Sequence, residues 1–363
     1  MEKRKIKQIY WFAYYNLNSP SVRYRAKYPL DFARTHLDVS SRLIIPGYSP
    51  KRLLNFFLGY VSALLFPGDD SLIVIQRVRS NFLYFNLLKL LVKVRKNLTV
   101  YDLDDADYLE YEPKNIHFFA RNCSFIAAGS SEITTYLQQF NPNVMHVTSP
   151  TPDLGIVKQH RNKTFTIGWI GGFGWGHKDS LYDLVFPAIK NLKFDCQLTL
   201  LGITKDSDVV EIRKYFEGHS NIKIVIPREI NWNDEKDLQT RISGFDVGVA
   251  TLLNHPIQIA KSGIKAKQYM NNGVPVLCND LAENNNVVID GYNGFICNTV
   301  KDFTNNLKEF EEMDDQRYRE FSRNGRNSTK NFDHHKWISD FEKIKSKMSV
   351  QIEDSAQLET SKS

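Results

Sequence analysis

The sequence predicts an α/β protein made of two doubly wound parallel sheets, and three observations lead to this prediction. The chain has 363 residues, 42% of them hydrophobic, which is enough for two domains with separate cores. Short apolar runs typical of strands alternate with segments of helical periodicity, which is the pattern of parallel βαβ units. A polar segment with two prolines, residues 148–153, interrupts the alternation, which then begins again. Each half is therefore expected to form a sheet of its own.

The first half is expected to form a domain of residues 1–148. Its predicted strands cover residues 7–13, 42–45, 72–76, 98–101, 125–128 and 144–147. The predicted helices between them cover residues 22–36, 51–65, 81–94 and 131–139. Residues 149–162 follow these elements and begin with the proline-rich polar segment, so we expect them to link the two domains.

The second half is expected to form a domain of residues 163–331. Its predicted strands cover residues 165–170, 197–201, 222–225, 247–250 and 274–277. The predicted helices cover residues 179–191, 209–216, 235–242, 262–272, 300–313 and 316–324. A last amphipathic helix is predicted at 332–348, and the polar residues 349–363 are predicted to form a disordered tail.

Composition and charge restrict the class of ligand. A formal net charge of +6 suits an anionic small molecule or an anionic membrane surface, and the absence of a basic stripe argues against nucleic acid. The four cysteines lie far apart without metal-ligand spacing, which predicts buried thiols in a reducing cytosol. The basic N-terminus leads into a strand without a cleavage site, so it is not expected to be a signal peptide. A cytoplasmic protein without a metal site is expected.

The longest apolar run extends from Leu53 to Phe66 and directly follows Lys51 and Arg52. It is too short to span a bilayer and is interrupted by polar or small residues at positions 55, 59 and 62. Two interpretations remain open. The run forms an ordinary core helix, or it forms a helix with one face on the inner surface of the cell membrane, which would make the protein a peripheral membrane protein.

The predicted helix at 262–272 carries the residue pattern most suggestive of a binding site. Ser262 is a favourable N-cap, and Gly273 is a favourable residue for the left-handed turn that ends a helix. Ser262, Lys265 and Gln268 are each three residues apart and fall along one edge of the helix. The free amides of a helix N-terminus favour an anion, and Lys265 adds a positive charge. These residues suit a diphosphate, whereas the alternative is that Lys265 and Gln268 are simply solvated.

The residues after this helix resemble a known family. The segment K-x-x-Q-Y-M-x-x-G-V-P-V at 265–276, followed by D-G-Y-N-G-F at 290–295, resembles the donor-site signature of GT-B glycosyltransferases. The resemblance is to the family-4-like enzymes (glycosyl transferases group 1) of bacterial polysaccharide synthesis. In that family a glutamate usually binds the donor's ribose, and this chain has Gln268 there. A second glutamate, eight positions earlier, is replaced by Ala260.

The resemblance implies a GT-B architecture, in which two Rossmann-like domains face a central cleft. It also implies a retaining transfer of a sugar from a nucleotide-diphosphate sugar to a saccharide or lipid-linked acceptor, in surface polysaccharide biosynthesis. No metal and no cofactor beyond this co-substrate are expected. Lys265 would stabilise charge on the departing nucleotide diphosphate. Ser262, Gly263 and Gln268 would complete this part of the donor site.

A glycine-rich loop follows the first strand of the second domain. Glycines at a strand-to-helix turn let backbone amides approach a phosphate, so Gly171 and Gly172 are candidates for the diphosphate site. A structural turn is the alternative. In the family, a basic residue near this loop reaches the diphosphate, and the candidates here are His177 and Lys178.

The first domain carries two polar segments at predicted strand ends. Residues 19–25, S-P-S-V-R-Y-R, resemble the start of a subset of these transferases. The resemblance implies that Ser21 lies at the acceptor cleft and that Arg23 and Arg25 lie near the cleft as candidate catalytic residues. The arginines do not share one helical face, so one of them could pair structurally instead. Asp104 and Asp105 are predicted to orient acceptor hydroxyls, to pair with Arg23 or Arg25, or to cap a loop.

Two alternatives to transfer remain open at this stage. The replaced glutamates are compatible with a non-catalytic protein that binds nucleotide sugars or glycans, since fold does not dictate function. A nucleotide-sugar epimerase of GT-B architecture is the other alternative, although it needs paired carboxylates around the sugar.

Overall fold

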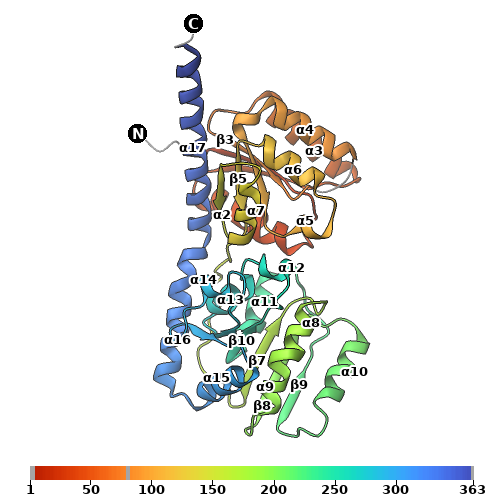
Figure 1. Ribbon diagram of the computed structural model, residues 1–363, viewed down its shortest axis with the longest axis vertical. Helices are drawn as coiled ribbons and strands as arrows, with labels where there is room; N and C mark the ends of the chain where they lie inside the picture. The colour runs from red at the N-terminus through yellow and green to blue at the C-terminus, as the bar shows by residue number, and fades with distance from the viewer. Residues whose placement is uncertain (1–4, 79–81, 361–363) are drawn as a thin grey trace. The chain divides into compact units, whose positions relative to one another are not determined.

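The computed structural model describes residues 5–78 and 82–360, and the chain forms two compact units (Figure 1). Unit 1 contains the residues up to Pro152 together with those from Asp333 onward, and unit 2 contains Asp153–Phe332. The first residue of the predicted helix 81–94 and the last three residues of the predicted tail lie outside the described residues.

Unit 1 is built on a six-stranded parallel sheet in the order β2-β1-β3-β4-β5-β6. The strands are β1 (Gln8–Phe12), β2 (Ser40–Ile44), β3 (Ser71–Gln76), β4 (Thr99–Leu103), β5 (Phe125–Ala128) and β6 (Val144–His146). Strands β3 and β4 are buried along their whole length because helices cover both faces, which explains why their sequences are apolar without alternation. The predicted strands of this half are confirmed.

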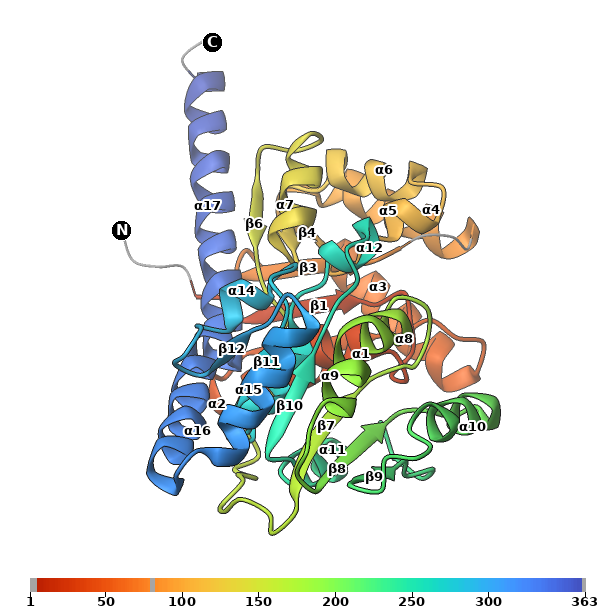
Figure 2. The same cartoon turned by 60° about the horizontal axis from the view of Figure 1, so that its bottom comes forward.

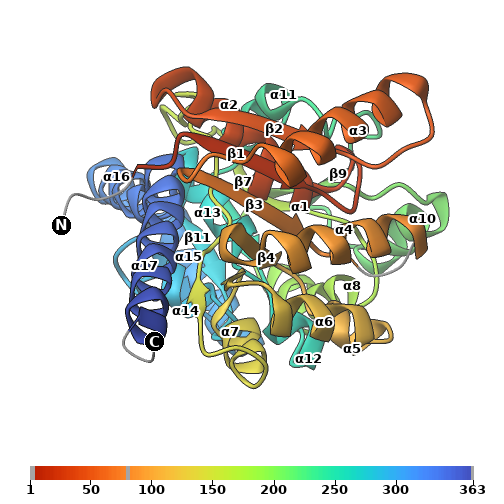
Figure 3. The same ribbon diagram turned by 90° about the horizontal axis from the view of Figure 1, so that it is seen from above.

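Helices cover both faces of the unit 1 sheet. One face packs against α1 (Pro20–Val22), a π-helical turn (Arg23–Lys27), α2 (Tyr28–His36) and α17 (His334–Thr360). The other side carries α3 (Pro50–Leu65), α4 (Phe82–Val94) and α6 (Lys114–Asn122), and Figure 3 shows α3 and α4 across the strands from α17. The aromatic pairs Phe12–Phe56 and Tyr101–Phe119 join that side to the sheet. The short α5 (Asp107–Glu110) and α7 (Ser131–Gln138) complete the larger elements.

The C-terminal helix α17 is part of the unit 1 core. The ring centroids of Trp337 and Phe341 both lie 5.7 Å from that of Trp11 on β1, next to the edge strand β2. The helix continues to Thr360, so the prediction of a disordered tail from residue 349 is corrected for residues 349–360. The polar composition of this stretch suggested disorder, but a helix that is already nucleated and packed can continue into polar sequence.

Unit 2 repeats the plan with the strand order β12-β11-β10-β7-β8-β9, all parallel (Figure 2). The strands are β7 (Phe165–Ile170), β8 (Cys196–Leu201), β9 (Ile222–Val225), β10 (Val247–Ala250), β11 (Val276–Cys278) and β12 (Gly294–Ile296). The helices are α8 (His177–Ser180), a π-helical turn (Leu181–Val185), α9 (Phe186–Lys190), α10 (Asp206–Tyr215), α11 (Glu235–Ile242), α12 (Pro256–Ile259), α13 (Ile264–Asn271), α14 (Asn284–Val287), α15 (Val300–Glu312) and α16 (Asp315–Thr329). The prediction of two doubly wound parallel-sheet domains is confirmed.

The first helical segment of each unit contains a π-helical turn, which the sequence did not predict. In each case a proline follows closely, Pro29 in unit 1 and Pro187 in unit 2. A proline ring lacks an N–H and clashes with the carbonyl four residues before it, so a wider turn removes the conflict without ending the helix. The two turns occupy corresponding places after the first strand of each unit.

All four cysteines are buried and unpaired, as predicted. Among the residues that the structure describes, no helix combines the length and the apolar character needed to cross a bilayer.

Candidate active site

The strand order of unit 2 reverses at β7, and the predicted donor residues come from the loops beside this point. The chain moves from β7 outward to β8 and β9, then crosses back to β10 on the other side of β7. The loops that leave β7 and β10 at their carboxyl ends therefore run in opposite directions, which opens the crevice where α/β sheets bind ligands. Helix α13 follows β10 in sequence and packs against it.

Tyr269 fixes α13 to these two strands. Its hydroxyl accepts a hydrogen bond from the Ile170 amide at 3.0 Å and donates one to the Val249 carbonyl at 3.1 Å. The helix can approach this closely because a glycine lies beneath the ring: a Cβ added to Gly248 would lie 2.3 Å from Tyr269 Cγ. The sequence did not predict that the Tyr269 hydroxyl bridges these two strands.

Lys265 lies one turn before Tyr269 on α13, and its ammonium meets the loop after β7. Its Nζ lies 3.0 Å from His177 Nδ1 and 5.2 Å from the centroid of the Trp169 ring. A Cβ added to Gly171 would lie 3.1 Å from Lys265 Cε, and the φ of Gly171 is +146°, so glycine suits this position. The structure thus brings together Lys265, His177 and Gly171, three residues singled out from the sequence.

The charge state of Lys265 is sensitive to pH near neutrality. Burial, and secondarily the charge of Lys261, lower the pKa of Lys265 from 10.5 to about 7. The ammonium faces an imidazole nitrogen in the free protein, and a ligand anion would supply the missing counter-charge. Binding of a diphosphate should therefore raise this pKa and take up a proton when the pH is above about 7.

This linkage gives a testable pH dependence. Between pH 7 and pH 9 the free protein loses the Lys265 proton, so the affinity for a nucleotide-diphosphate sugar should fall by up to roughly tenfold per pH unit. Calorimetry in buffers of different ionisation enthalpy would measure the proton uptake directly. An affinity that stays constant over this range would show that the ammonium of Lys265 does not hold the ligand.

The start of α13 differs from the prediction in one respect. Its N-cap is Gly263 with φ +66° and ψ +22°, and no side chain caps the helix, so the prediction of Ser262 as N-cap is wrong. The left-handed conformation suits glycine, and Ser262 is instead largely buried before it. The helix has no acidic residue in its first turn, which leaves this positive end suited to an anion. Gly273 does end the helix as predicted, with φ +68°.

Gln268 is 7% exposed, and its backbone carbonyl accepts a bond from Asn272 Nδ2 at 2.7 Å. Its side chain is therefore largely buried, unlike the solvated side chain of the alternative interpretation. An amide can both donate and accept hydrogen bonds, so the residue keeps the chemistry needed to bind a ribose hydroxyl.

The loops after β7 and β8 meet through two glycines. Gly202, at the carboxyl end of β8, has φ +111°, and a Cβ there would lie 2.1 Å from the carbonyl oxygen of Gly171. By contrast, a Cβ on Gly172 would meet nothing within 4 Å, so the loop geometry does not require glycine at that position. Gly202 was missed because a single glycine after a strand carries little sequence signal.

Lys178 forms ion pairs with carboxylates of α10 and not with the residues around Lys265. Its Nζ lies 2.6 Å from Glu211 and 3.3 Å from Asp208, both on α10. Hydrogen bonding to Glu211 raises the pKa of Lys178, which keeps it charged and paired. Of the two basic candidates near the glycine loop, the structure therefore places His177 beside Lys265 and Lys178 against α10.

The polar loop after β11 is held by its own asparagines. Asn279 bonds both the amide and the carbonyl of Leu252, at 3.0 and 2.7 Å, and Asn284 Nδ2 donates to the Ala250 carbonyl at 2.9 Å. These amides tie the loop to the end of β10 and so fix the strand ends next to α13.

In unit 1, polar side chains gather at the carboxyl ends of β1, β3 and β4. The Ser21 hydroxyl donates to Asp104 at 2.6 Å, and Gln76 Nε2 reaches the same hydroxyl at 3.1 Å. The Gln76 side-chain oxygen, Oε1, accepts a hydrogen bond from Trp11 Nε1 at 2.9 Å. Ser21 and Asp104, two predicted acceptor-cleft residues, are thus in direct contact. Gln76 was missed although it ends a predicted strand.

Arg77 is a further residue of the unit 1 cluster that was not predicted. It is bidentate to Asp107, at 2.8 and 2.6 Å, and its Nη1 lies 3.4 Å from Asp105 and 3.7 Å from Asp104. Both aspartates therefore lie beside Arg77, whereas the sequence had suggested Arg23 or Arg25 as their partner. Arg77 directly follows an apolar strand, and its local sequence gives no sign of an acidic partner.

Arg25 is a structural residue in this fold. Both Arg25 and Asp102 have side chains with no exposed surface, and they form a bidentate ion pair, while Arg25 Nη1 also donates to the Val147 carbonyl. Burial raises the pKa of Asp102 to about 6 against the opposing attraction of Arg25. The prediction that both arginines face the ligand is corrected for Arg25, whose guanidinium has no surface through which to contact a substrate.

Arg23 is 3% exposed, and its Nη1 donates to the carbonyls of Leu17 and Asn18, both at 2.9 Å. It therefore shapes the loop after β1, which carries Ser21.

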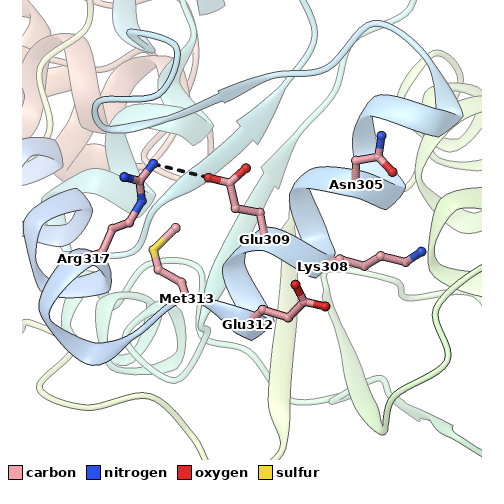
Figure 4. A pocket seen from close by; sticks show the side chains of 6 residues that line it. All are labelled: Asn305, Lys308, Glu309, Glu312, Met313 and Arg317. Carbon is pink, nitrogen blue, oxygen red and sulfur yellow. Dashed lines mark hydrogen bonds and ion pairs between the residues drawn. The ribbon is translucent and has the colours of Figure 1, made fainter.

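A hollow elsewhere in unit 2 contains none of the predicted site residues. It has a volume of about 440 Å³ and is lined by residues of α15, α16 and the turn between them: Asn305, Lys308, Glu309, Glu312, Met313 and Arg317 (Figure 4). The pair of Arg317 and Glu309 crosses it at 3.4 Å. Its mixed charges form no convergent set, so we do not assign it to the site.

No protein-family model matches the sequence, and no curated protein matches it. Solved structures do match. Sucrose-phosphate synthase from Thermosynechococcus elongatus has a TM-score of 0.68 at 12% identity, covering 95% of this chain and 100% of that one. Anabaena Alr3699/HepE, solved in complex with UDP-glucose, has a TM-score of 0.61 at 14% identity over 96% and 99%. A glycosyltransferase from Rickettsia africae ESF-5 has a TM-score of 0.65 at 10% identity over 94% and 98%. With its two six-stranded parallel sheets, the chain has the GT-B fold.

Proposed function

We propose that this protein is a glycosyltransferase that moves a sugar from a nucleotide-diphosphate sugar to a saccharide acceptor. The observation that carries the proposal is the position of Lys265 at the uncapped N-terminus of α13, beside the strand-order reversal of unit 2. The ammonium there faces His177 and lacks a carboxylate counter-charge among the contacts of the described residues. HepE, a structural neighbour, holds UDP-glucose, which supports a nucleotide sugar as the ligand class.

The proposed donor site assigns a task to each residue. Lys265 and the first amides of α13 neutralise the diphosphate, and the Gly171 turn lets backbone approach it. Gln268 bonds the ribose through its amide. As the bond to the sugar breaks, negative charge grows on the departing diphosphate, so Lys265 binds the transition state more tightly than the ground state. These groups replace the charge that a divalent metal would supply, and we propose that transfer needs neither metal nor cofactor.

The acceptor would bind at the polar cluster of unit 1. Asp104 and Asp105 offer carboxylate oxygens to acceptor hydroxyls, while Ser21 and Arg77 hold these carboxylates in place. We further propose a retaining reaction with an oxocarbenium-like transition state, a role in surface polysaccharide synthesis with a saccharide or lipid-linked acceptor, and a cytoplasmic location. These finer assignments rest on the resemblance of the donor motif.

Calorimetric titration with a panel of nucleotides and nucleotide sugars, followed by a transfer assay on the best ligand, tests the proposal. We expect a nucleotide-diphosphate sugar to bind more tightly than the matching monophosphate, and transfer to persist in EDTA. Activity that is lost in chelator and restored by manganese would shift the chemistry to a metal site and contradict the role of Lys265.

A non-catalytic nucleotide-sugar-binding protein is the second candidate, because Gln268 and Ala260 stand where the family has glutamates. Tight donor binding without transfer to any saccharide or lipid-linked acceptor would favour it. A GT-B epimerase would instead interconvert the free nucleotide sugar, which the same reaction mixtures would reveal.

A further inference from the structure

Helices α3 and α4 of unit 1 expose large apolar side chains. The exposed fraction is 58% at Leu54, 61% at Phe57 and 69% at Leu83. In α3 only Gly59, Tyr60 and Ala63 are buried. The interpretation of residues 53–65 as an ordinary core helix is therefore wrong for this face of α3, which packs on the sheet through its opposite side.

The exposed residues form a stripe along each helix. On α3 the exposed apolar residues are Leu53, Leu54, Phe57, Leu58 and Leu65. On α4 they include Leu83, Leu90 and Val94, which are spaced by seven and four residues. Both spacings keep the side chains on one side of a helix.

The two stripes are neighbours because the helices run parallel and in register. The rings of Phe56 and Tyr84 lie 5.6 Å apart, the Tyr60 hydroxyl donates to the Leu87 carbonyl at 2.8 Å, and Arg95 Nε donates to the Leu64 carbonyl at 2.7 Å. The residue numbers of these contacts increase along both helices, as they do for parallel helices. Figure 1 shows α3 and α4 next to each other. The exposed stripes flank this seam and form one surface, here called the α3–α4 face: Leu54, Phe57, Leu58, Leu83, Leu90 and Val94.

The charged side chains carried by the two helices and by Lys96 are all positive. Lys51 and Arg52 are exposed at the N-terminal end of the α3–α4 face, and Lys93 and Lys96 are exposed toward its C-terminal end. Neither helix contains Asp or Glu. Within the described part of the chain, none of these four cations is paired with a carboxylate.

We propose that the α3–α4 face binds the surface of an anionic lipid bilayer. Leucine and phenylalanine side chains on parallel helices can enter the boundary between headgroups and acyl chains, while the cations at both ends contact lipid phosphates. A second copy of this chain suits the surface less well, because a two-fold interface would bring identical cation sets close to one another. The face lies on unit 1 and is independent of the donor residues, so the proposal holds whether or not the protein transfers sugar.

The experiment is flotation of the full-length protein with vesicles. One set contains phosphatidylcholine alone, and the other contains about one quarter phosphatidylglycerol. We expect binding to the anionic set that weakens as salt is raised, because the screening length falls from about 10 Å at 0.1 M to about 3 Å at 1 M.

Two double variants separate the apolar and electrostatic contributions. Leu54→Ser with Phe57→Ser should abolish flotation, and Lys51→Gln with Lys93→Gln should lower the affinity on the order of 20-fold. Val210→Ser, at an apolar residue of unit 2 that is 65% exposed, is the matched control and should bind like the wild type. All of these residues are exposed, so the unfolding midpoints should stay unchanged.

Three outcomes would overturn the proposal. The first is an absence of flotation with anionic vesicles. The second is equal binding of the wild type to both vesicle sets. The third is a wild-type dimer in sedimentation that Leu54→Ser with Phe57→Ser disperses, which would assign the face to a second copy.

Discussion

Lys265→Ala is expected to abolish or severely reduce sugar transfer while the fold stays intact. The side chain supplies the ammonium at the N-terminus of α13, and a charge-assisted hydrogen bond to phosphate contributes about 1.5–3 kcal/mol to binding. The loss should be greater in the rate of transfer than in affinity, because charge grows on the leaving group. Single-turnover transfer and calorimetry measure the two effects separately.

The chain offers a matched control for this variant. Lys178→Ala removes a lysine only a few residues from Gly171, but one that is paired with Asp208 and Glu211. It should leave nucleotide-sugar binding close to the wild-type value. Wild-type transfer and binding by Lys265→Ala would show that the diphosphate does not sit at α13, and the donor-site assignment of unit 2 would fail with it.

Two conservative substitutions on α13 test the donor-site assignment further. Lys265→Arg should not restore full transfer, because a planar guanidinium replaces a compact ammonium and Lys265 Cε already lies close to Gly171. Gln268→Glu restores the residue usual in the family, so a ribose site should tolerate it and bind the donor at least as tightly. Loss of donor affinity in Gln268→Glu would contradict ribose binding at this position.

Breaking the ion pair between Arg25 and Asp102 is expected to have the largest effect on stability. Both side chains are completely buried, so Arg25→Met leaves an unpaired carboxylate in the core and also removes a donor from the Val147 carbonyl. Such a change typically costs about 3–5 kcal/mol. In urea this corresponds to a midpoint for unit 1 that is lower by about 1–2 M.

The double variant Arg25→Met with Asp102→Leu identifies the cause. It removes both charges together, so it should recover a large part of the lost stability. If Arg25→Met instead unfolds at the wild-type midpoint but no longer transfers sugar, Arg25 acts in the reaction and the structural assignment made above is wrong.

Periodicity in the sequence predicted the fold because the helices and strands follow local rules. The strands Phe165–Ile170, Ile222–Val225 and Val247–Ala250 were predicted to the residue, since each is a short, mainly apolar run that directly follows a polar residue. The π-helical turns were missed because they depend on backbone adjustment near Pro29 and Pro187, which periodicity does not report. The helix α6 was missed because a short helix in mixed sequence gives a weak signal.

Site residues that belong to a local sequence motif were predictable. Contacts between side chains from strands far apart in the sequence were not. Lys265 and Gly171 were found because their local sequences are distinctive. The arginine beside Asp104 and Asp105 was not predicted, since their contact with Arg77 is decided by which strands are neighbours in the sheet. The bridging hydroxyl of Tyr269 depends on the spacing of β7 and β10, which sequence alone does not contain.

The position of α17 in the core of unit 1 has a consequence for synthesis. The strands of unit 1 leave the ribosome first, but the side chains that cover Trp11 lie on the last helix, at Trp337 and Phe341. Unit 2 is one continuous segment and can complete its core while the chain is still growing. The core of unit 1 is therefore completed after that of unit 2, and the unit 1 sheet keeps an open apolar face until α17 has been synthesised. Chaperones that bind exposed apolar surface would meet the nascent chain at this face.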